Sequence, residues 1–393
     1  MDLTFILLPE IQKFINENLK SDVQKLALKK NPFPEYEWKA IINQIQAKKK
    51  AQYKLPHWFE TENIIYPSVL SIEQTSSEPL ARFKAKLLSG KKLIDLTGGF
   101  GIDAYYFSKQ FKEIYHCEFN EELSEVVKSN ARFLQTENIK TFKGDSIEIL
   151  KTLNETFDWI YIDPARRSDT KQKVFLLKDC TPNVPENLNE YFKYSNKILI
   201  KTAPILDISA GLNELENVKK IYIISLDNEV KELLWVLEKG FKQNIELEAV
   251  NINKQEEYET YKTSLEDDSY CNYSEPLTFL YEPFASVMKT GNFNKIGNDY
   301  GLGKLHQHSH LYTNEHLIDF PGRRFEIESK IAYQKKDMKV IFENQKFNIT
   351  IRNFPVSVEE IRKKWKIKDG GSKFAFFTTN YQNEKIVLIC NKI

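Results

Sequence analysis

The sequence of 393 residues has few of the residues that define disulfide-stapled, metal-binding or membrane proteins. Its four cysteines, Cys117, Cys180, Cys271 and Cys390, lie far apart without a CxxC pair, which predicts reduced thiols and no zinc framework. Glycine and proline, at 14 each, are too scarce for long flexible tails. No apolar run approaches the roughly 20 residues that cross a bilayer. Residues 1–4 include an acid where a signal peptide is basic, so we expect a cytoplasmic protein without membrane contact.

The chain also lacks a net charge of one sign, with 56 Lys and Arg against 55 Asp and Glu. Taken over the whole chain, this balance argues against a strongly basic nucleic-acid binder. The charges are unevenly placed, however. Residues 322–393 hold 16 basic and 8 acidic side chains, which leaves 40 against 47 for residues 1–321. A basic module on an acidic remainder is typical of a separate nucleic-acid-docking domain, although a solvated basic face has the same composition.

Hydrophobic periodicity divides the chain into regions. Apolar residues recur at helical spacing through residues 1–85, which predicts a helical N-terminal segment. Residues 86–255 alternate short β-rich runs with amphipathic helices, the pattern of βαβ units and a parallel sheet. Residues 256–277 are polar and acidic and are predicted to be a linker. The predicted strands are Lys92–Thr97, Ile114–Phe119, Ile139–Lys143, Trp159–Asp163, Lys197–Lys201, Lys220–Leu226 and Ile245–Ile252.

The pattern leaves Lys231–Glu238 open between helix and strand. Beyond residue 277 the sequence is rich in aromatic residues and predicts an α+β structure. There we expect a turn at Asp369-Gly370-Gly371, a helix over Val358–Trp365, and strands at Phe347–Arg352, Phe374–Thr379 and Lys385–Cys390.

A glycine-containing segment, Asp95-Leu96-Thr97-Gly98-Gly99-Phe100-Gly101, follows the first predicted strand of the sheet and precedes a helix. Glycines allow the backbone to approach a ligand, and a helix N-terminus offers unpaired N–H groups. This context indicates a nucleotide-cofactor loop. Gly99-x-Gly101-x-x-Ala104, with Glu118 about 20 residues on, also fits the weak dinucleotide pattern of an NAD enzyme.

S-adenosylmethionine accounts for more of the residues than NAD does. Asp95 ends the first strand, where a carboxylate would hold the amino group of the cofactor, and Glu118 ends the second, where an acid would hold the ribose hydroxyls. Asp145 follows the third strand and Asp163 the fourth. The carboxyl ends of parallel strands meet at the ligand-binding edge of such a sheet. Simpler roles remain open, since Glu118 and Asp145 are each also placed to cap the helix that follows them.

The fourth strand ends in Asp163-Pro164-Ala165-Arg166-Arg167, which carries the candidate catalytic residues. Methyl transfer is an in-line displacement, so an enzyme mainly positions the nucleophile and accepts its proton. Asp163 and the carbonyls after it are placed to accept hydrogen bonds from an amine or ring nitrogen. Arg166 or Arg167 is suited to contact a phosphate or a base, although ion pairs with nearby acids are the alternative.

A cysteine nucleophile, which methylation of a pyrimidine carbon requires, is missing after the fifth strand, so a base nitrogen or ribose oxygen is the expected acceptor. His306-x-His308-x-His310 would place three imidazoles on one face of a strand. No cysteine or acid cluster accompanies them, so we predict a surface or packing role and no metal site.

These residues resemble the class I S-adenosylmethionine-dependent methyltransferases, and the whole chain resembles a bacterial group with a THUMP-like C-terminal domain. Motifs specific to that group are Leu28-Lys29-Lys30-Asn31-Pro32-Phe33-Pro34, Ser76–Lys84, Tyr281-Glu282-Pro283, His310-Leu311-Tyr312, Phe320-Pro321-Gly322-Arg323, Arg352-Asn353-Phe354-Pro355 and Lys368-Asp369-Gly370-Gly371. The resemblance implies an α/β, Rossmann-like core of seven strands, a ferredoxin-like piece at 278–321 and a basic THUMP-like domain at 322–393.

The resemblance further implies an RNA substrate, such as tRNA or rRNA, and a cofactor site. The expected cofactor residues are Asp95, Thr97, Gly98, Gly99, Gly101, Glu118, Asp145 and Asp163, and the expected RNA contacts are Arg167, Arg323, Arg324, Arg352, Arg362, Lys363, Lys364 and Lys366. Two positions depart from the pattern. Thr97 stands where many such enzymes have glycine, and no aromatic residue follows Pro164. The second departure keeps open a non-catalytic RNA-binding scaffold as the alternative function.

Overall fold

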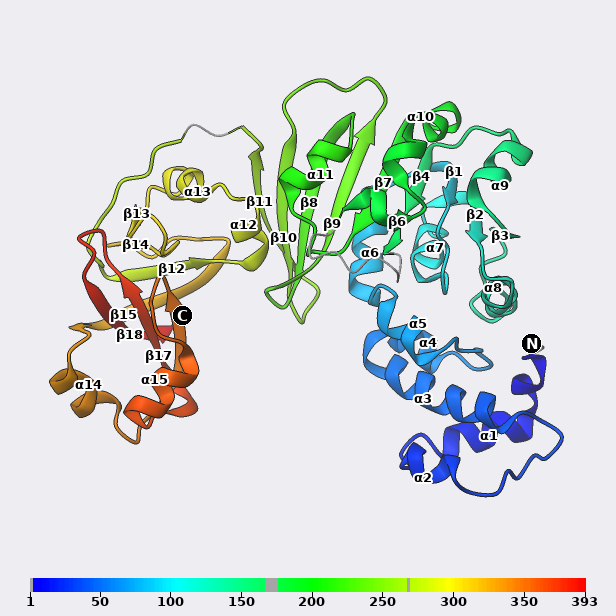
Figure 1. Cartoon of the computed structure of the whole chain (residues 1–393), viewed down its shortest axis with the longest axis horizontal. Helices are drawn as coiled ribbons and strands as arrows, with labels where there is room; N and C mark the ends of the chain where they lie inside the picture. Colours follow the sequence, from blue (N-terminus) through cyan, green and yellow to red (C-terminus); the bar gives the residue numbers. More distant parts are fainter. Residues whose placement is uncertain (1–2, 167–175, 267–268) are drawn as a thin grey trace. The chain divides into compact units, whose positions relative to one another are not determined.

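A computed structural model describes residues 3–166, 176–266 and 269–393 (Figure 1). By its contacts the chain divides into two compact units, Met1–Lys219 with Leu234–Lys242, and Lys220–Leu233 with Gln243–Ile393. The hydrogen-bonded order of its largest sheet is β11-β10-β8-β9-β7-β4-β1-β2-β3. None of the described helices is long and apolar enough to cross a membrane.

The first unit begins with a helical segment, as predicted. Its elements are η1 (Thr4–Leu7), α1 (Pro9–Glu17), α2 (Val23–Ala27), α3 (Trp38–Lys54), α4 (Pro56–Glu60), α5 (Val69–Gln74) and α6 (Glu78–Leu87). Apolar side chains at helical spacing, among them Ile11, Ile41 and Ile45, are fully buried. Proline occupies the first turn of α1 and α4, where its missing N–H has no intrahelical partner to lose.

The remainder of the first unit is the predicted α/β core, built of parallel strands in the order β3-β2-β1-β4-β7. Figure 1 shows α7 and α8 on one side of these strands and α9 and α10 on the other. Strand β4 is buried on both faces, which explains its continuous apolar sequence. The elements are β1 (Gly90–Asp95), α7 (Ile102–Phe107), β2 (Phe111–Glu118), α8 (Glu121–Phe133), β3 (Ile139–Lys143), α9 (Ser146–Leu153), β4 (Trp159–Ile162), β5 (Ala165–Arg166), η2 (Leu177–Asp179), β6 (Cys180–Thr181), α10 (Val184–Tyr194), β7 (Lys197–Thr202) and α11 (Ile208–Glu214).

The second unit contains two groups of strands. In the first, β10 (Glu246–Ile252) pairs in parallel with β8 (Val218–Leu226) and antiparallel with β11 (Tyr258–Ser264). The other is a seven-stranded sheet in the order β13-β14-β12-β15-β18-β17-β16. Its elements are β12 (Phe279–Pro283), α12 (Ala285–Lys289), α13 (Phe293–Asp299), β13 (Gly303–Lys304), β14 (Tyr312–Asn314), β15 (Gly322–Ala332), α14 (Lys335–Phe342), β16 (Lys346–Arg352), α15 (Val358–Trp365), β17 (Lys368–Thr379) and β18 (Lys385–Lys392).

The structure decides one segment that the sequence pattern leaves open and corrects two others. The undecided stretch Lys231–Glu238 belongs to strand β9 (Glu229–Glu238), and residues 256–277 are not only a linker because they contain β11. With β10 and β11 the large sheet has nine strands, two more than the resemblance implies. Asp369-Gly370-Gly371 lies inside β17. There the pairing with β16 passes from Phe347 opposite Asp369 to Asn348 opposite Phe374. The glycines, at φ +93° and +90°, therefore lie in an irregular stretch of β17 that this pairing skips, and not in a turn between elements.

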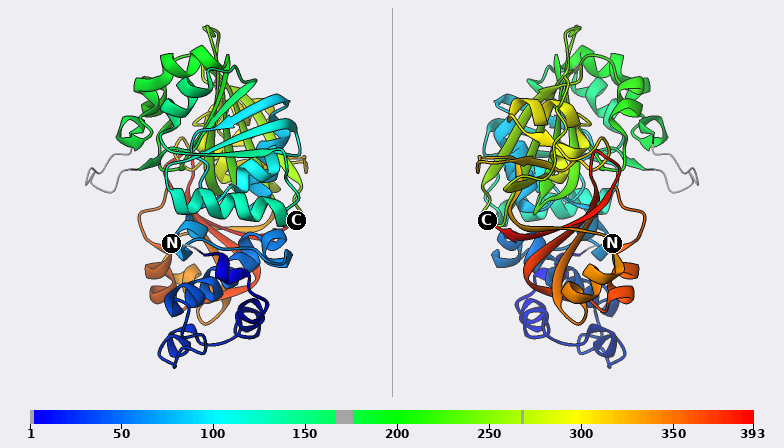
Figure 2. Two further views of the ribbon diagram at one scale, coloured as in Figure 1. Left: turned by 90° about the vertical axis from the view of Figure 1, so that its right-hand side faces the viewer. Right: turned by 90° about the vertical axis from the view of Figure 1, so that its left-hand side faces the viewer.

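The C-terminal part of the second unit has its own apolar core. Helices α14 and α15 pack on one face of the strands β16, β17 and β18, and Figure 2 shows both helices on the same side of those strands. Met338, Phe342, Ile361 and Trp365 from the helices meet Phe377 and its neighbours in the sheet. Helix α15 begins with a complete capping box between Ser357 and Glu360, which explains why its predicted start is correct.

A buried carboxylate joins the two motif-bearing strands β12 and β15 to β16. Glu282, 1% exposed, accepts hydrogen bonds from Arg323 Nε at 2.6 Å and forms an ion pair with Arg352 Nη2 at 2.7 Å. The carboxylate thus has two arginine partners, each of which reaches solvent on its outer side. This arrangement meets the requirement that a buried charge be paired and hydrogen bonded.

Replacing this carboxylate should destabilise the second unit. We expect Glu282→Ala to lower the free energy of unfolding by about 2 kcal/mol, because it removes a carboxylate that pairs with two arginines, and these arginines then stay partly desolvated. Urea unfolding followed by circular dichroism measures the change. The control Glu328→Ala breaks the solvent-exposed pair with Lys373 and should cost less than about 0.5 kcal/mol. Equal costs for both variants would contradict a structural role for Glu282.

Candidate functional site

The carboxyl ends of the parallel strands surround a cavity of about 700 Å³, a size typical of small-molecule sites. It is lined by the loop after β1, the ends of β2 and β4, the turn before α9, and the residues around the start of α10. Asp95, Glu118, Asp145 and Asp163, which the sequence places at four strand ends, all line it. The structure therefore brings the predicted acids together at one edge of the sheet, as the topology requires.

The glycines of the loop have different roles. A Cβ atom on Gly98 would lie 2.2 Å from Nε2 of the buried His116, so this glycine is required by packing. At Gly99, with φ +55°, the nearest atom to such a Cβ is the Thr97 carbonyl oxygen at 3.8 Å, so the backbone faces open space. Gly101, at φ +78°, begins helix α7 in a left-handed conformation that few other residues adopt. The loop thus leaves room for a ligand over Gly99.

Glu118 at the end of β2 holds the loop in place. Its Oε2 accepts a hydrogen bond from the Gly99 N–H at 2.8 Å, and its Oε1 accepts one from the Asn120 N–H at 2.7 Å. Asn120, and not Glu118, caps helix α8 by accepting from the Leu123 N–H at 3.0 Å. Of the two roles left open for Glu118 by the sequence, the helix cap therefore belongs to Asn120.

Asp95 and Asp163 are connected through Thr97. Asp95 Oδ1 accepts from the Thr97 N–H at 2.9 Å and from its hydroxyl at 3.3 Å, and that hydroxyl accepts from the Asp163 N–H at 2.6 Å. A glycine at position 97 would lack this link, so Thr97 ties the ends of β1 and β4 together. Asp95 is only 1% exposed, and burial, together with the nearby charges of Asp103 and Asp163, raises its pKa well above the usual range.

Two lysines outside the predicted set of site residues pair with acids of the cavity, Asp163 and Asp103. Lys201, at the end of β7, forms an ion pair with Asp163 Oδ2. Lys84 on α6 is fully buried and forms an ion pair with Asp103 Oδ1 at 3.1 Å. Lys84 and Lys201 hold the pKa of Asp103 below its usual value although burial opposes this. Asp103 is therefore a buried, charged member of the cavity wall, and more than a first-turn acid of α7.

The ends of β2 and β3 supply the remaining wall of the cavity. Asp145 caps α9, since its Oδ1 accepts from the Ile147 N–H at 2.9 Å and the Glu148 N–H at 3.1 Å, as in the simpler of its two predicted roles. Phe119, directly after Glu118, is 81% exposed although it lines the cavity. Such an exposed ring beside polar groups is suited to stack on a planar ligand. Phe119 is not among the site residues predicted from the sequence, because its position completes a predicted strand.

The segment after Asp163 forms one side of the cavity. Ala165 and Arg166 make the short strand β5, which pairs with Cys180 and Thr181 of β6. Pro182 and Asn183, which follow β6, line the cavity, so this stretch is part of its wall. Arg166 is exposed in β5, and Arg167 lies outside the described residues.

The predicted RNA-contacting residues occupy several surroundings in the second unit. Arg323 and Arg352 hold Glu282, and Arg324 pairs with Asp319 at 3.5 Å. On α15, Arg362 pairs with Asp369 at 2.5 Å, whereas Lys363 and Lys364 are exposed. Lys366 pairs with Glu343 at 3.1 Å. Lys363 and Lys364 are therefore the members of the set most open to a partner.

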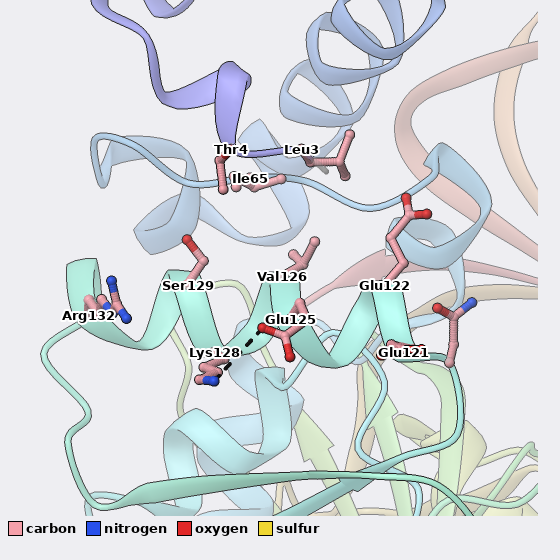
Figure 3. A pocket seen from close by; sticks show the side chains of 11 residues that line it. Leu3, Thr4, Ile65, Glu121, Glu122, Glu125, Val126, Lys128, Ser129 and Arg132 are labelled. Atoms are coloured by element: carbon pink, nitrogen blue, oxygen red, sulfur yellow. Dashed lines mark ion pairs between the residues drawn. The ribbon is translucent and has the colours of Figure 1, made fainter. Parts of the chain in front are cut away.

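A second cavity of about 690 Å³ lies apart from the strand ends, where the N-terminal residues Leu3 and Thr4 face helix α8 (Figure 3). Acidic and basic side chains of α8 line it, and Lys128 and Glu125 among them form an exposed pair at 3.9 Å. It contains none of the predicted site residues. No group of three His, Cys, Asp or Glu side chains within the described ranges is arranged to hold a metal ion.

Comparisons with known proteins agree with this description. A THUMP domain-like family model matches residues 322–392, and a ferredoxin-like domain model matches residues 279–321. The crystal structure of a proposed methyltransferase from Porphyromonas gingivalis W83 matches with a TM-score of 0.88 and 29% identity, over 100% of this chain and 99% of that one. Among proteins with curated descriptions, none matches significantly.

Other solved structures match only part of the chain. An rRNA methylase from Streptococcus thermophilus is 14% identical over 41% of this chain and 93% of its own, with a TM-score of 0.31. The tRNA m1G37 methyltransferase of M. jannaschii is 14% identical over 43% of this chain and 52% of its own, with a TM-score of 0.30.

The whole chain therefore shares the fold of a proposed methyltransferase, and its C-terminal part matches a ferredoxin-like and a THUMP domain-like family model. The fold is a Rossmann-like α/β core followed by a THUMP-like C-terminal domain, as the resemblance predicts.

Because the pKa of Asp95 is raised, the charged carboxylate costs stability at neutral pH. We expect Asp95→Asn, which keeps the acceptor oxygen for Thr97, to raise the free energy of unfolding by about 1 kcal/mol at pH 7.5. The gain should shrink as the pH falls and vanish near pH about 4, where the unfolded chain also protonates Asp95. Urea unfolding at several pH values measures it. A variant less stable than the parent at pH 7.5 would contradict the raised pKa.

Proposed function

We propose that the protein is an S-adenosylmethionine-dependent methyltransferase that acts on a structured RNA, such as tRNA or rRNA, at a base nitrogen. The observation that carries the proposal is the meeting of Asp95, Glu118 and Asp163 in one cavity around the open backbone of Gly99. Six acidic residues line the cavity, and none of its described lining residues is Lys or Arg; the acids are Asp95, Asp103, Glu118, Asp145, Asp163 and Glu186. Lys84 and Lys201 pair with only two of them, Asp103 and Asp163. This excess of negative groups favours a cationic ligand, which S-adenosylmethionine is.

The residues present fit that cofactor. Asp95, buried at the end of β1, would accept hydrogen bonds from its amino group, and Glu118 would accept them from the ribose hydroxyls. Phe119 would stack on the adenine ring, and Asp145 lies on the same side of the cavity beside the start of α9. An NAD enzyme would leave the burial of Asp95 and its link to Asp163 unexplained, which supports S-adenosylmethionine over the dinucleotide.

When bound, the cofactor supplies a methyl group on a positively charged sulfur. Asp163, held by Thr97 and Lys201, would accept a hydrogen bond or a proton from the attacking nitrogen and aim its lone pair. Lys201 neutralises the carboxylate between turnovers and fixes its orientation. Arg166, on the exposed strand β5 beside the cavity wall, would contact an RNA phosphate.

The surroundings of the cysteines support direct transfer without a covalent intermediate. Cys117 lines the cavity, but burial raises the pKa of its thiol well above the usual range. The thiolate, and not the thiol, is the nucleophile in cysteine chemistry. Cys180 is fully buried in β6. Neither side chain is therefore suited to attack a pyrimidine ring.

The RNA substrate is supported by the C-terminal domain. Its family model is THUMP domain-like, and its charge is +8 by sequence. A non-catalytic RNA-binding scaffold is the second candidate, favoured by the lack of an aromatic residue after Pro164 and by the pairing of Asp163 with Lys201. Both functions need RNA binding, and only the first needs turnover.

Ligand binding and methyl incorporation separate these functions. We expect calorimetry to show binding of S-adenosylhomocysteine and not of NAD. We also expect incorporation of labelled methyl groups into RNA from a strain that lacks the gene. Asp163→Asn should lower incorporation about 100-fold because it removes the proton acceptor. The control Asp158→Asn changes an acid at the opposite end of β4 and should keep activity. Cofactor binding without incorporation by the parent would favour the scaffold, and equal incorporation by Asp163→Asn would remove Asp163 from the mechanism.

Charge reversal on α15 tests the RNA contact. We expect Lys363→Glu with Lys364→Glu to weaken RNA binding and to reduce the slope of log K against log salt concentration by about 2, because each lysine that contacts a phosphate contributes nearly one unit. Filter binding at several salt concentrations measures the slope, while affinity for S-adenosylhomocysteine should not change. The same reversal at Lys13 and Lys20 in the N-terminal segment is the control. An unchanged slope in the α15 variant would exclude these lysines.

A further inference from the structure

The ferredoxin-like part of the second unit contains a cavity of about 400 Å³ that the proposed methyl transfer does not use. Its wall includes Lys304 from β13, His308 and His310 from the following turn, and Phe293 and Asn294 from the start of α13. These histidines belong to the His306-x-His308-x-His310 motif, which the structure places in a turn and not on a strand. The motif therefore contributes two residues to the wall of a cavity.

Lys304 is the main charged group of this cavity. It is 2% exposed, and its Nζ donates to the Asn294 Oδ1 at 3.3 Å. No described carboxylate forms an ion pair with it, and none of the described residues that line the cavity is Asp or Glu. Burial lowers the pKa of Lys304. A buried ammonium group normally has an anionic partner, so this one is an exception that a ligand would explain.

The imidazoles beside Lys304 add donors and no negative charge. The ring of His310 stacks on Phe293 with centroids 3.7 Å apart, and its Nδ1 is buried without a hydrogen-bond partner among the described residues. Burial, followed by the charges of Lys304, His308 and Arg352, lowers the pKa of His310 to about 4. The described wall of the cavity therefore carries one ammonium group, with imidazole and amide groups around it.

We propose that this cavity is a phosphate-binding site, in which Lys304, with His308, His310 and Asn294, holds a phosphate group of an RNA ligand. Phosphate oxygens accept charge-assisted hydrogen bonds from ammonium and imidazole N–H groups. A divalent metal ion is a poorer occupant, because it would add charge beside an ammonium group and no carboxylate lines the described wall. The site lies in the second unit and does not depend on cofactor binding or on methyl transfer.

Phosphate binding to the full-length protein tests this assignment. We expect inorganic phosphate to raise the melting temperature saturably and to compete with a 5′-phosphorylated oligoribonucleotide. The variant Lys304→Met keeps the length of the side chain and removes its charge, so its phosphate affinity should fall about tenfold or more. The variant should also melt higher than the parent without ligand, because it removes a buried unpaired charge. The control Lys295→Met changes a lysine on α13 that pairs with Asp299 outside the cavity.

The results separate a binding site from a packing role. Loss of phosphate stabilisation in Lys304→Met but not in Lys295→Met supports the site, as does a phosphate-dependent shift of the His310 ring signals in nuclear magnetic resonance spectra. A 5′-hydroxyl oligoribonucleotide that competes as well as the phosphorylated one would identify a chain phosphate as the ligand, and one that does not would identify a terminal phosphate. Unchanged phosphate affinity in Lys304→Met, or no saturable binding by the parent, would overturn the proposal. Affinity for S-adenosylhomocysteine, measured in the same variants, reports separately on the proposed methyltransferase function.

Discussion

The hydroxyl of Thr97 connects the two central strands at the point where a ligand would bind. It donates to Asp95 at the end of β1 and accepts from the backbone of Asp163 at the end of β4. Parallel strands carry their loops at the same edge, but the positions of those loops depend on side-chain contacts such as this one. The link keeps two acids at fixed places around the cavity, and Glu118 holds the glycine loop between them.

Buried charges recur throughout the structure, and most have specific partners. Lys84 pairs with Asp103 in the first unit, and Glu282 is held by two arginines in the second. Each arrangement connects elements distant in sequence, and each would be costly to leave half complete. Lys304 differs because its partners among the described residues are uncharged, namely the Asn294 amide and the face of the Phe293 ring. The paired charges stabilise the fold, whereas the lack of a charged partner at Lys304 is the reason that we propose a ligand there.

The pKa values of two neighbouring acids, Asp95 and Asp103, are shifted in opposite directions because their charged partners differ. Asp103 is buried beside Lys84 and Lys201, so its pKa is lowered and it stays charged. Asp95 is more deeply buried, and among the described residues its hydrogen bonds come from Thr97, so burial raises its pKa. A cationic ligand beside Asp95 would reverse that direction. The site is therefore less stable without a ligand than its surroundings, as is common where residues serve binding.

The amino-acid sequence by itself determined the alternation of strands and helices in the core, because hydrophobic periodicity and glycine positions are local properties. It also determined that Asp95, Glu118, Asp145 and Asp163 end successive strands, and parallel topology then places them at one edge. Only the tertiary structure decided which acids are neutralised, because Lys84 and Lys201 reach them from elements distant in sequence. In the same way it showed β9 as a strand, placed the glycines of β17 in an irregular stretch of that strand, and brought Lys304 and His310 into one cavity. Pairing and burial depend on contacts between distant residues, which no local pattern specifies.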